Sequence, residues 1–184
     1  MGPMCKTFLI DQMPICEPSP WMNDVGERFS RWSLTDYRQG GAVMRKFLAD
    51  PGSWSLLIYG EKGTYKTALA AAAIRAVRER YPAGCCCFLD PEWARKKLIA
   101  CETDWIETWE SVPLLVWDDL GVMRDTPHLH SMTLAILRAR YSHMRKTIIT
   151  SNVDRDALSR AFDDRLADRL KEGMELFSGK QSKR

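Results

Sequence analysis

A glycine-containing loop followed by lysine and threonine is the first feature of the sequence suited to binding phosphate. The apolar run at 56–59 ends at Gly60, and Lys66 and Thr67 open an alanine-rich stretch typical of a helix. Backbone N–H groups and the positive end of a helix dipole favour bound phosphate in such a loop. The lysine then contacts the β- and γ-phosphates, and the threonine hydroxyl binds Mg²⁺. The pattern predicts an ATP-binding loop formed by Gly60, Glu61, Lys62, Gly63, Thr64, Tyr65, Lys66 and Thr67.

Tyr65 stands where phosphate-binding loops usually carry a second glycine. The usual pattern is G-x-x-x-x-G-K-[ST], and a tyrosine with positive φ would cost about 1–3 kcal/mol. We expect Tyr65 to have helical dihedrals, with its ring pointing away, because Gly63 remains where the backbone must approach phosphate. The alternatives are a chance connection between strand and helix, or a loop too strained to work.

Two carboxylates follow a second apolar run, at residues 114–117. At such a strand end Asp118 would hold Mg²⁺ together with Thr67, and Asp119 would orient or deprotonate the attacking water. Two adjacent carboxylates repel each other without a cation, although a solvated strand end remains the simpler alternative. Because Asp119 is shorter than glutamate, we expect slow hydrolysis.

Asn152, Arg165 and Arg169 are further candidates for contact with a nucleotide. Asn152 ends a strand expected beside the first, so its amide would reach the γ-phosphate or the water, unless it only forms a turn. Arg165 and Arg169 lie four residues apart on one expected helix. They form either surface pairs with neighbouring aspartates or an arginine finger that reaches the nucleotide of a neighbouring subunit.

Apolar runs and amphipathic stretches alternate along the chain. We expect strands at residues 54–59, 85–89, 113–117, 146–150 and 174–177. Helices are expected at residues 42–48, 66–81, 91–102, 103–111, 128–144 and 154–173, with Gly40 and Gly41 as a break before the first. Buried strands joined by helices predict an α/β fold with a parallel five-stranded sheet covered on both faces.

Length and composition are those of a single globular domain. The 184 residues divide into an irregular, proline-containing arm at 1–24 and a domain at 25–184. No run of 18 apolar residues and no signal sequence is present, so we expect a cytoplasmic protein with no membrane partner. The six cysteines lack C-x-x-C or zinc-finger spacing, which favours buried, reduced thiols over disulfides or a structural metal.

The motifs together resemble those of AAA+ ATPases of the DnaC/DnaI helicase-loader and IstB transposition-helper group. The resemblance rests on the phosphate loop, on LLVWDDLG at 114–121, on TIITSN at 147–152 and on RLADRL at 165–170, and it covers roughly residues 25–184. It implies a P-loop NTPase of the AAA+/ASCE type without a lid domain.

The same resemblance implies what the protein does and which residues take part. It implies ATP-dependent loading or remodelling of a replicative helicase on single-stranded DNA, or help to a transposase, with self-association through the ATP site. Arg169 is the first choice for the finger and Arg165 the second. The nucleotide roles fall to Lys66, Thr67, Asp118, Asp119 and Asn152.

Two other classes of function remain open, and the DNA contact is the least supported expectation. The fold could serve as a nucleotide-gated binding module with negligible hydrolysis, or as a small-molecule kinase, although no arginine-rich lid follows the fourth helix. Net charge is only +3, too weak to indicate nucleic acid by itself. The candidate DNA contacts are Arg138, Arg140, Arg145, Lys146 and the basic tail at 180–184, unless these form a solvated helix face.

Overall fold

The computed structural model of the chain describes Phe29 and residues 32–81, 85–100, 103–121 and 127–179. Its centre is a parallel sheet in the spatial order β2-β3-β4-β1-β5. The strands are β1 (Ser55–Tyr59), β2 (Cys86–Leu89), β3 (Leu114–Trp117), β4 (Lys146–Ser151) and β5 (Met174–Phe177). The expected pairing of β4 with β1 is therefore confirmed, and the carboxyl ends of β3, β4 and β1 meet at one edge.

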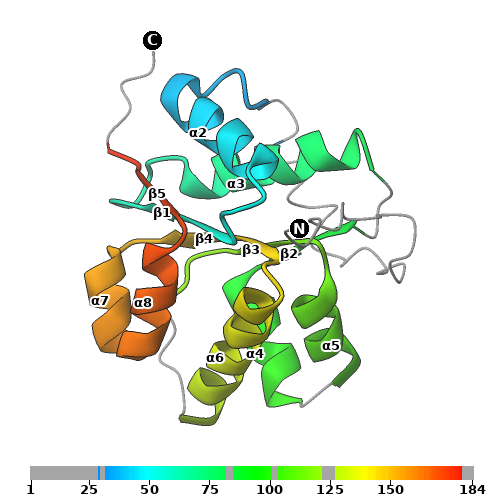
Figure 1. Cartoon of the computed structure of the whole chain (residues 1–184), viewed down its shortest axis with the longest axis vertical. Coiled ribbons are helices and arrows are strands. Elements are labelled where there is room, and N and C mark those ends of the chain that lie inside the picture. Colours follow the sequence, from blue (N-terminus) through cyan, green and yellow to red (C-terminus); the bar gives the residue numbers. More distant parts are fainter. Residues whose placement is uncertain (1–28, 30–31, 82–84, 101–102, 122–126, 180–184) are drawn as a thin grey trace, which may run out of the picture.

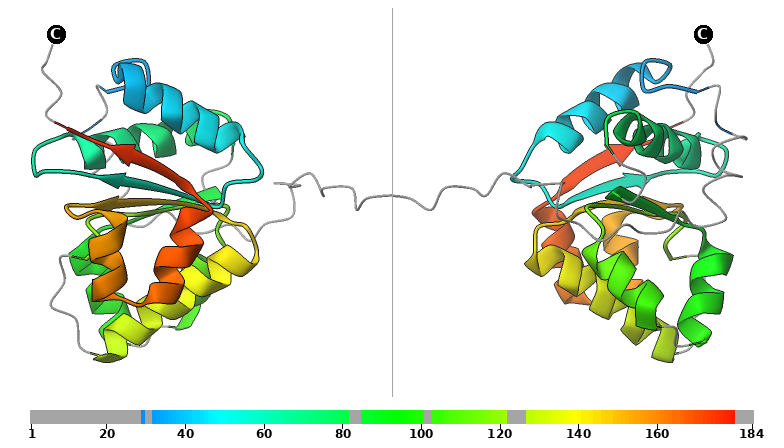
Figure 2. Two further views of the ribbon diagram at one scale, coloured as in Figure 1. Left: turned by 60° about the vertical axis from the view of Figure 1, so that its left-hand side comes forward. Right: turned by 90° about the vertical axis from the view of Figure 1, so that its right-hand side faces the viewer.

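Helices cover both faces of this sheet, as Figures 1 and 2 show. One face carries α2 (Arg38–Ala49) and α3 (Lys66–Arg78). The other carries α4 (Pro91–Ile99), α5 (Thr103–Ser111), α6 (Pro127–Ser142), α7 (Arg155–Ala161) and α8 (Asp164–Lys171). Leu56 and Ile58 of β1 point to the first face and Leu57 to the second, as the two-residue period of a strand requires. The predicted α/β fold is confirmed.

Small side chains bring α3 close to the sheet. Ala70 and Ala73 are fully buried in the cluster that α3 forms with the strands. Cys85, Cys86 and Cys87 are free thiols buried in the core, as predicted for small hydrophobic residues. Within the described ranges, no helix is long and apolar enough to cross a membrane.

Gly40 and Gly41 lie inside α2, so the predicted break at these residues is wrong. Both are buried, and close packing is the reason that glycine is needed there. A Cβ on Gly40 would lie 2.8 Å from a methyl group of Leu69, and one on Gly41 would lie 1.9 Å from the carbonyl oxygen of Leu34. Tertiary packing thus offsets the low helix propensity of the pair.

The single helix predicted over residues 154–173 is also wrong, because the chain forms two helices there. Phe162 ends α7, and Asp163 adopts an extended conformation and caps α8 by accepting a hydrogen bond from Leu166 N at 2.6 Å. Other predicted ends differ by a few residues. The arm at 1–24 and the tail at 180–184 lie outside the described residues.

Arg140 is a fully buried cation, so its expected contact with DNA is wrong. Its guanidinium donates to Thr147 Oγ1 at 2.8 Å. It also donates to four carbonyl oxygens, those of Trp109 at 2.7 Å, Glu110 at 3.5 Å, Val112 at 2.8 Å and Lys146 at 2.6 Å. Burial lowers the pKa of Arg140 to about 9, which still leaves it charged at neutral pH. The side chain therefore fastens the end of α5 to the start of β4.

The neighbouring basic residues are also engaged within the molecule. The Lys146 ammonium donates to the carbonyl oxygens of Asp50 and Ser53, so Lys146 is not available as a DNA contact either. Arg145 donates to the carbonyl oxygen of Glu110. Arg138 forms an ion pair at 2.7 Å with Asp163, the residue that caps α8.

Arg140→Met is expected to destabilise the protein by about 3 kcal/mol or more, because several buried carbonyl groups lose their donor. Urea unfolding measures this change, and the half-exposed Arg138 provides the control. Arg138→Met should lower the free energy of unfolding by only about 1 kcal/mol. Equal effects of the two substitutions would contradict the role assigned to Arg140.

Candidate functional site

The loop between β1 and α3 is shaped by two glycines with different roles. Gly60 has φ 146°, and a Cβ there would lie 2.3 Å from the carbonyl oxygen of Ser178. Gly63 has φ 79°, and nothing lies within 4 Å of the position that its Cβ would take. Close packing therefore requires glycine at the first position, and the left-handed backbone favours it at the second.

Ser178 fixes the loop from the end of β5, a contact that the sequence did not predict. Its N–H donates to Tyr59 O at 2.7 Å, and its hydroxyl donates to Thr64 O at 2.7 Å. The two bonds join the last strand to both ends of the loop. The only signal for Ser178 in the sequence is its position directly after the final apolar run.

Lys66 lies inside the curve of the loop. Its ammonium donates to Gly60 O and Glu61 O at 2.8 Å each and to Asn152 Oδ1 at 3.0 Å. Burial lowers the pKa of Lys66, and the carboxylates of Asp119 and Asp118 oppose that effect. The lysine is thus a cation held at the loop by backbone carbonyls, in reach of a phosphate on the same loop.

Asp118 accepts hydrogen bonds from two threonines on neighbouring elements. Thr67 Oγ1 of α3 lies 3.0 and 3.1 Å from its two carboxylate oxygens, and Thr150 Oγ1 of β4 lies 2.6 Å from Oδ1. Burial raises the pKa of Asp118, and the two hydroxyl groups oppose the rise. Thr150 was missed as a site residue. Its only signal in the sequence was a hydroxyl near the end of the strand that was expected beside the first strand.

Asn152 connects the lysine with the second carboxylate. Its Nδ2 donates to Asp119 Oδ1 at 2.6 Å while its Oδ1 accepts from Lys66. Asp119 has φ 52°, and its N–H donates to Thr150 Oγ1 at 2.8 Å. Burial raises the pKa of Asp119, against the attraction of Lys66 and Lys62. The structure therefore brings Lys66, Asn152 and Asp119 together.

The donor atoms fit Mg²⁺ with a nucleotide. Thr67 and Asp118 offer a hydroxyl and a carboxylate, the hard oxygen ligands that Mg²⁺ prefers alongside phosphate oxygens and water. Asp118 and Asp119 are adjacent acids with raised pKa, so a bound cation would favour their charged forms. The loop N–H groups and the start of α3 suit the phosphates.

The prediction for Tyr65 is wrong, because its backbone is left-handed. Tyr65 has φ 64° and ψ 19° and is the N-cap of α3. Its ring lies 6.0 Å, centroid to centroid, from the ring of Trp32 and packs on the core below α2 and α3. The loop thus keeps the positive φ of the usual glycine, and aromatic packing offsets part of the strain.

Arg169 lies away from this edge of the sheet. Its carbonyl oxygen accepts a hydrogen bond from Trp54 Nε1 at 2.9 Å, at the start of β1. The five residues of β1 span about 16 Å, so the backbone of Arg169 lies far from the loop of its own subunit. Arg165 is exposed on the first turn of α8.

Comparison with solved structures identifies the fold. The chain is similar to the DnaC helicase loader (TM-score 0.70, 22% identity, 83% of this chain and 98% of that one). It is also similar to DnaI (0.67, 21%, 83% and 93%) and to AMPPCP-bound DnaA from Aquifex aeolicus (0.68, 21%, 80% and 50%). No protein-family model and no curated protein matches the sequence. The chain therefore shares the fold of these proteins, and the expected likeness to helicase loaders is confirmed for the fold.

Replacing Tyr65 by alanine and by glycine should measure the strain of the loop. Both substitutions remove the ring, but only glycine adopts positive φ without a steric cost. We expect Tyr65→Gly to be more stable than Tyr65→Ala by about 1 kcal/mol in urea unfolding. Equal stabilities would show that the backbone at this position is not left-handed.

Asp118→Asn is expected to stabilise the nucleotide-free protein at pH 7. Because the folded pKa of Asp118 is raised, the unfolded chain releases this proton first, and the folded state loses stability as pH rises from below 3.8 through the folded pKa. Asparagine avoids that cost, so urea unfolding should show a gain over the wild type that is larger at pH 7 than at pH 4.

The exposed Asp156 supplies the control for this experiment, since Asp156→Asn should give no gain that grows with pH. The same Asp118→Asn protein should lose the Mg²⁺-dependent part of ATP binding. An asparagine variant less stable than the wild type at pH 7 would contradict the assigned effect of burial.

Proposed function

We propose that this protein is an ATPase that loads or remodels a replicative helicase on single-stranded DNA. The observation that carries the proposal is the connected set of Lys66, Asn152 and Asp119 beside the pair of Thr67 and Asp118. The likeness of the fold to the DnaC helicase loader supports the choice of partner. With helicase and DNA as partners, the proposed compartment is the cytoplasm.

Each residue of the site has a defined task in this proposal. Lys66 leaves the carbonyl oxygens of Gly60 and Glu61 and binds the β- and γ-phosphates of ATP. Thr67 and Asp118 hold Mg²⁺, which neutralises phosphate charge when bound.

Asp119 and Asn152 act on the attacking water. Asp119 accepts its proton while the water oxygen bonds to the γ-phosphorus and the bond to ADP breaks. The raised pKa of Asp119 suits a base, and the amide of Asn152 fixes the carboxylate at 2.6 Å. These two residues therefore affect turnover more than ATP affinity.

Assembly of several copies through the ATP site is part of the proposal. Arg169, with Arg165 second, supplies the arginine that contacts the phosphates of a neighbouring copy. The backbone of Arg169 lies at the start of β1, at the opposite end from the loop of its own chain, which favours action between subunits.

A helper of a DNA transposase is the nearest alternative, and it shares the same nucleotide chemistry. Partner capture distinguishes the two. The hydrolysis-deficient Asp119→Asn protein, loaded with ATP, should retain a replicative helicase from the source cell, and capture of a transposase instead would favour the alternative.

A nucleotide-gated module with negligible turnover is a second alternative, favoured by the strained Tyr65. In that case ATP would bind with the affinity expected for the loop, but single-stranded DNA and partner protein would leave hydrolysis at background.

Lys66→Ala should lower ATP affinity at least about tenfold and abolish hydrolysis, because the loop loses its phosphate-binding cation. ATPase rates with and without single-stranded DNA, together with ATP titration, measure both effects. The exposed Lys96 on α4 is the matched control, and Lys96→Ala should retain ATP affinity. Turnover unchanged by Lys66→Ala would refute the enzymatic proposal.

A further inference from the structure

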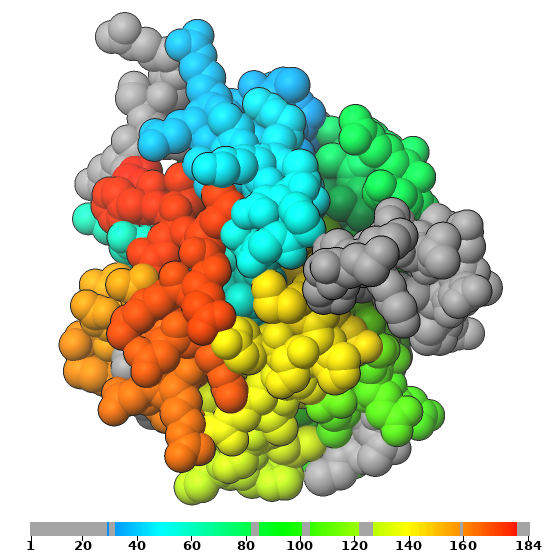
Figure 3. Space-filling model, in the orientation of Figure 1, coloured from blue at the N-terminus to red at the C-terminus, as the bar shows by residue number. Residues whose placement is uncertain are grey.

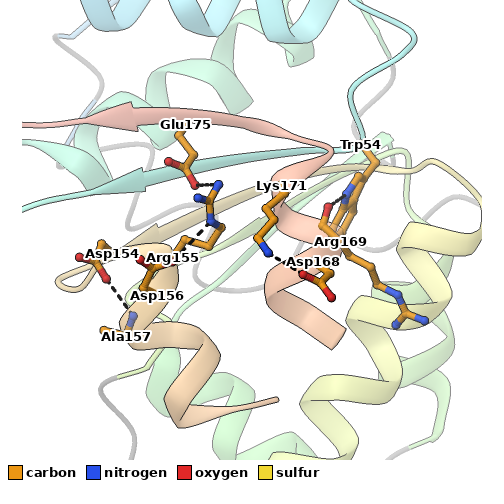
Figure 4. A network of polar contacts seen from close by, with 9 residues as sticks. All are labelled: Trp54, Asp154, Arg155, Asp156, Ala157, Asp168, Arg169, Lys171 and Glu175. Atoms are coloured by element: carbon orange, nitrogen blue, oxygen red, sulfur yellow. Dashed lines mark hydrogen bonds and ion pairs between the residues drawn. The ribbon is translucent and has the colours of Figure 1, made fainter. Parts of the chain in front are cut away.

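Arg169 has no acidic partner within the part of its own subunit that the structure describes. Among the described residues its guanidinium forms no ion pair, and its Nη1 is buried without a hydrogen-bond acceptor. Buried arginine nitrogens normally find an acceptor, so an orphaned one indicates a functional constraint. Figure 4 shows the side chain extending from α8 toward α6.

The acidic side chains at positions 168–175 are each bound by another group. Asp168 pairs with Lys171 at 2.6 Å, and Glu175 of β5 pairs with Arg155 at 2.7 Å, as Figure 4 shows. Glu172 lies one turn after Arg169, close enough along a helix for an ion pair. Both of its carboxylate oxygens instead accept from the Tyr141 hydroxyl at 2.9 Å.

Tyr141 therefore contacts both Arg169 and Glu172, which do not pair with each other. The guanidinium of Arg169 lies over its ring, 4.9 Å from the centroid, and its hydroxyl binds Glu172. The ring itself is held edge-on by Trp54, with centroids 5.4 Å apart and planes at 80°. The hydrogen bond to Glu172 raises the pKa of Tyr141, so the hydroxyl remains a donor at neutral pH.

We propose that Tyr141 is a positioning residue, which holds Arg169 on its ring and binds Glu172 so that the arginine stays unpaired for the nucleotide phosphates of a second copy of this chain. This inference rests on the proposed ATPase function and deepens it. In the space-filling view of Figure 3, the surface over α8 adjoins that over the end of α6, which is where Tyr141 and Arg169 meet.

The geometry and the charge of Arg169 indicate which group it binds. A planar guanidinium suits a phosphate, which it binds through two parallel hydrogen bonds. The phosphate loop of the same subunit is excluded as the target, because Arg169 lies at the opposite end of β1. A second copy brings a loop of the same kind, so the acceptor comes with self-association.

Substitutions at Tyr141 separate its two contacts. Tyr141→Leu removes the aromatic face but keeps an apolar side chain against Trp54, and it should lower kcat about tenfold with ATP affinity unchanged. Tyr141→Phe keeps the face and frees Glu172 to pair with Arg169, so kcat should fall about three- to tenfold. The double variant Tyr141→Phe with Glu172→Gln should restore most of that loss, which a merely structural role of Tyr141 would not do.

The experiment measures steady-state ATPase, ATP affinity, self-association with a non-hydrolysable ATP analogue, and thermal unfolding of each variant beside Arg169→Ala. Full activity of Tyr141→Phe and Tyr141→Leu, or no recovery in the double variant, would overturn the inference about Tyr141. A loss of activity in Arg169→Ala would in that case still support Arg169 as the arginine finger. Wild-type protein that neither hydrolyses ATP nor self-associates would overturn the proposed function and this inference together.

Discussion

The buried carboxylate of Asp118 is the contact on which the arrangement of the site depends. It ends β3, accepts a hydrogen bond from Thr67 at the start of α3, and accepts another from Thr150 near the end of β4. Three elements distant in sequence are thereby fixed at one edge of the sheet. The contact exists because β4 lies between β3 and β1, so that the strand bearing the acid and the strand feeding the loop share one neighbour.

The charges at this edge are out of balance, and their environment makes the imbalance costly. Asp118 is a buried acid and Asp119 a half-buried one, both with raised pKa, and Lys66 is a buried base with lowered pKa. Two carboxylates and one ammonium leave a net negative charge where water solvates it poorly. A divalent cation that arrives with a phosphate chain satisfies both, since the cation favours the acids and the loop N–H groups favour the phosphates. Strain adds to the cost, because Tyr65 and Asp119 both have positive φ beside the site.

The sequence was informative wherever one segment determines the outcome. The phosphate loop, the two acids after β3 and the strand ending at Asn152 each combine an apolar run with a polar end, and that pattern predicts a parallel sheet with chemistry at its carboxyl edge. The parallel pairing of β1 with β4 then brings Asn152 to the loop.

The failures share a cause, which is dependence on distant contacts. The ring of Tyr65 packs near Trp32 and offsets part of the strain of the left-handed backbone, and glycine is needed at position 40 because Leu69 fills the space of a side chain. Arg140 was read as a surface cation, yet carbonyl groups from α5 and β4 surround it. Ser178 contacts the loop from the far end of the chain, and only its place after the last apolar run pointed to it. None of these contacts leaves a periodic signal in the sequence.

The last strand connects the end of α8 with the phosphate loop. Arg169 precedes β5 by a few residues, and Ser178 follows it directly and holds the loop through Thr64 O. All four residues of β5 pair with β1, so the position of this strand is fixed by the sheet. In the proposed assembly, the length of β5 would set the distance between the arginine and the phosphate loop of one copy, and repeated head-to-tail contacts between identical subunits require that distance to be the same in every copy.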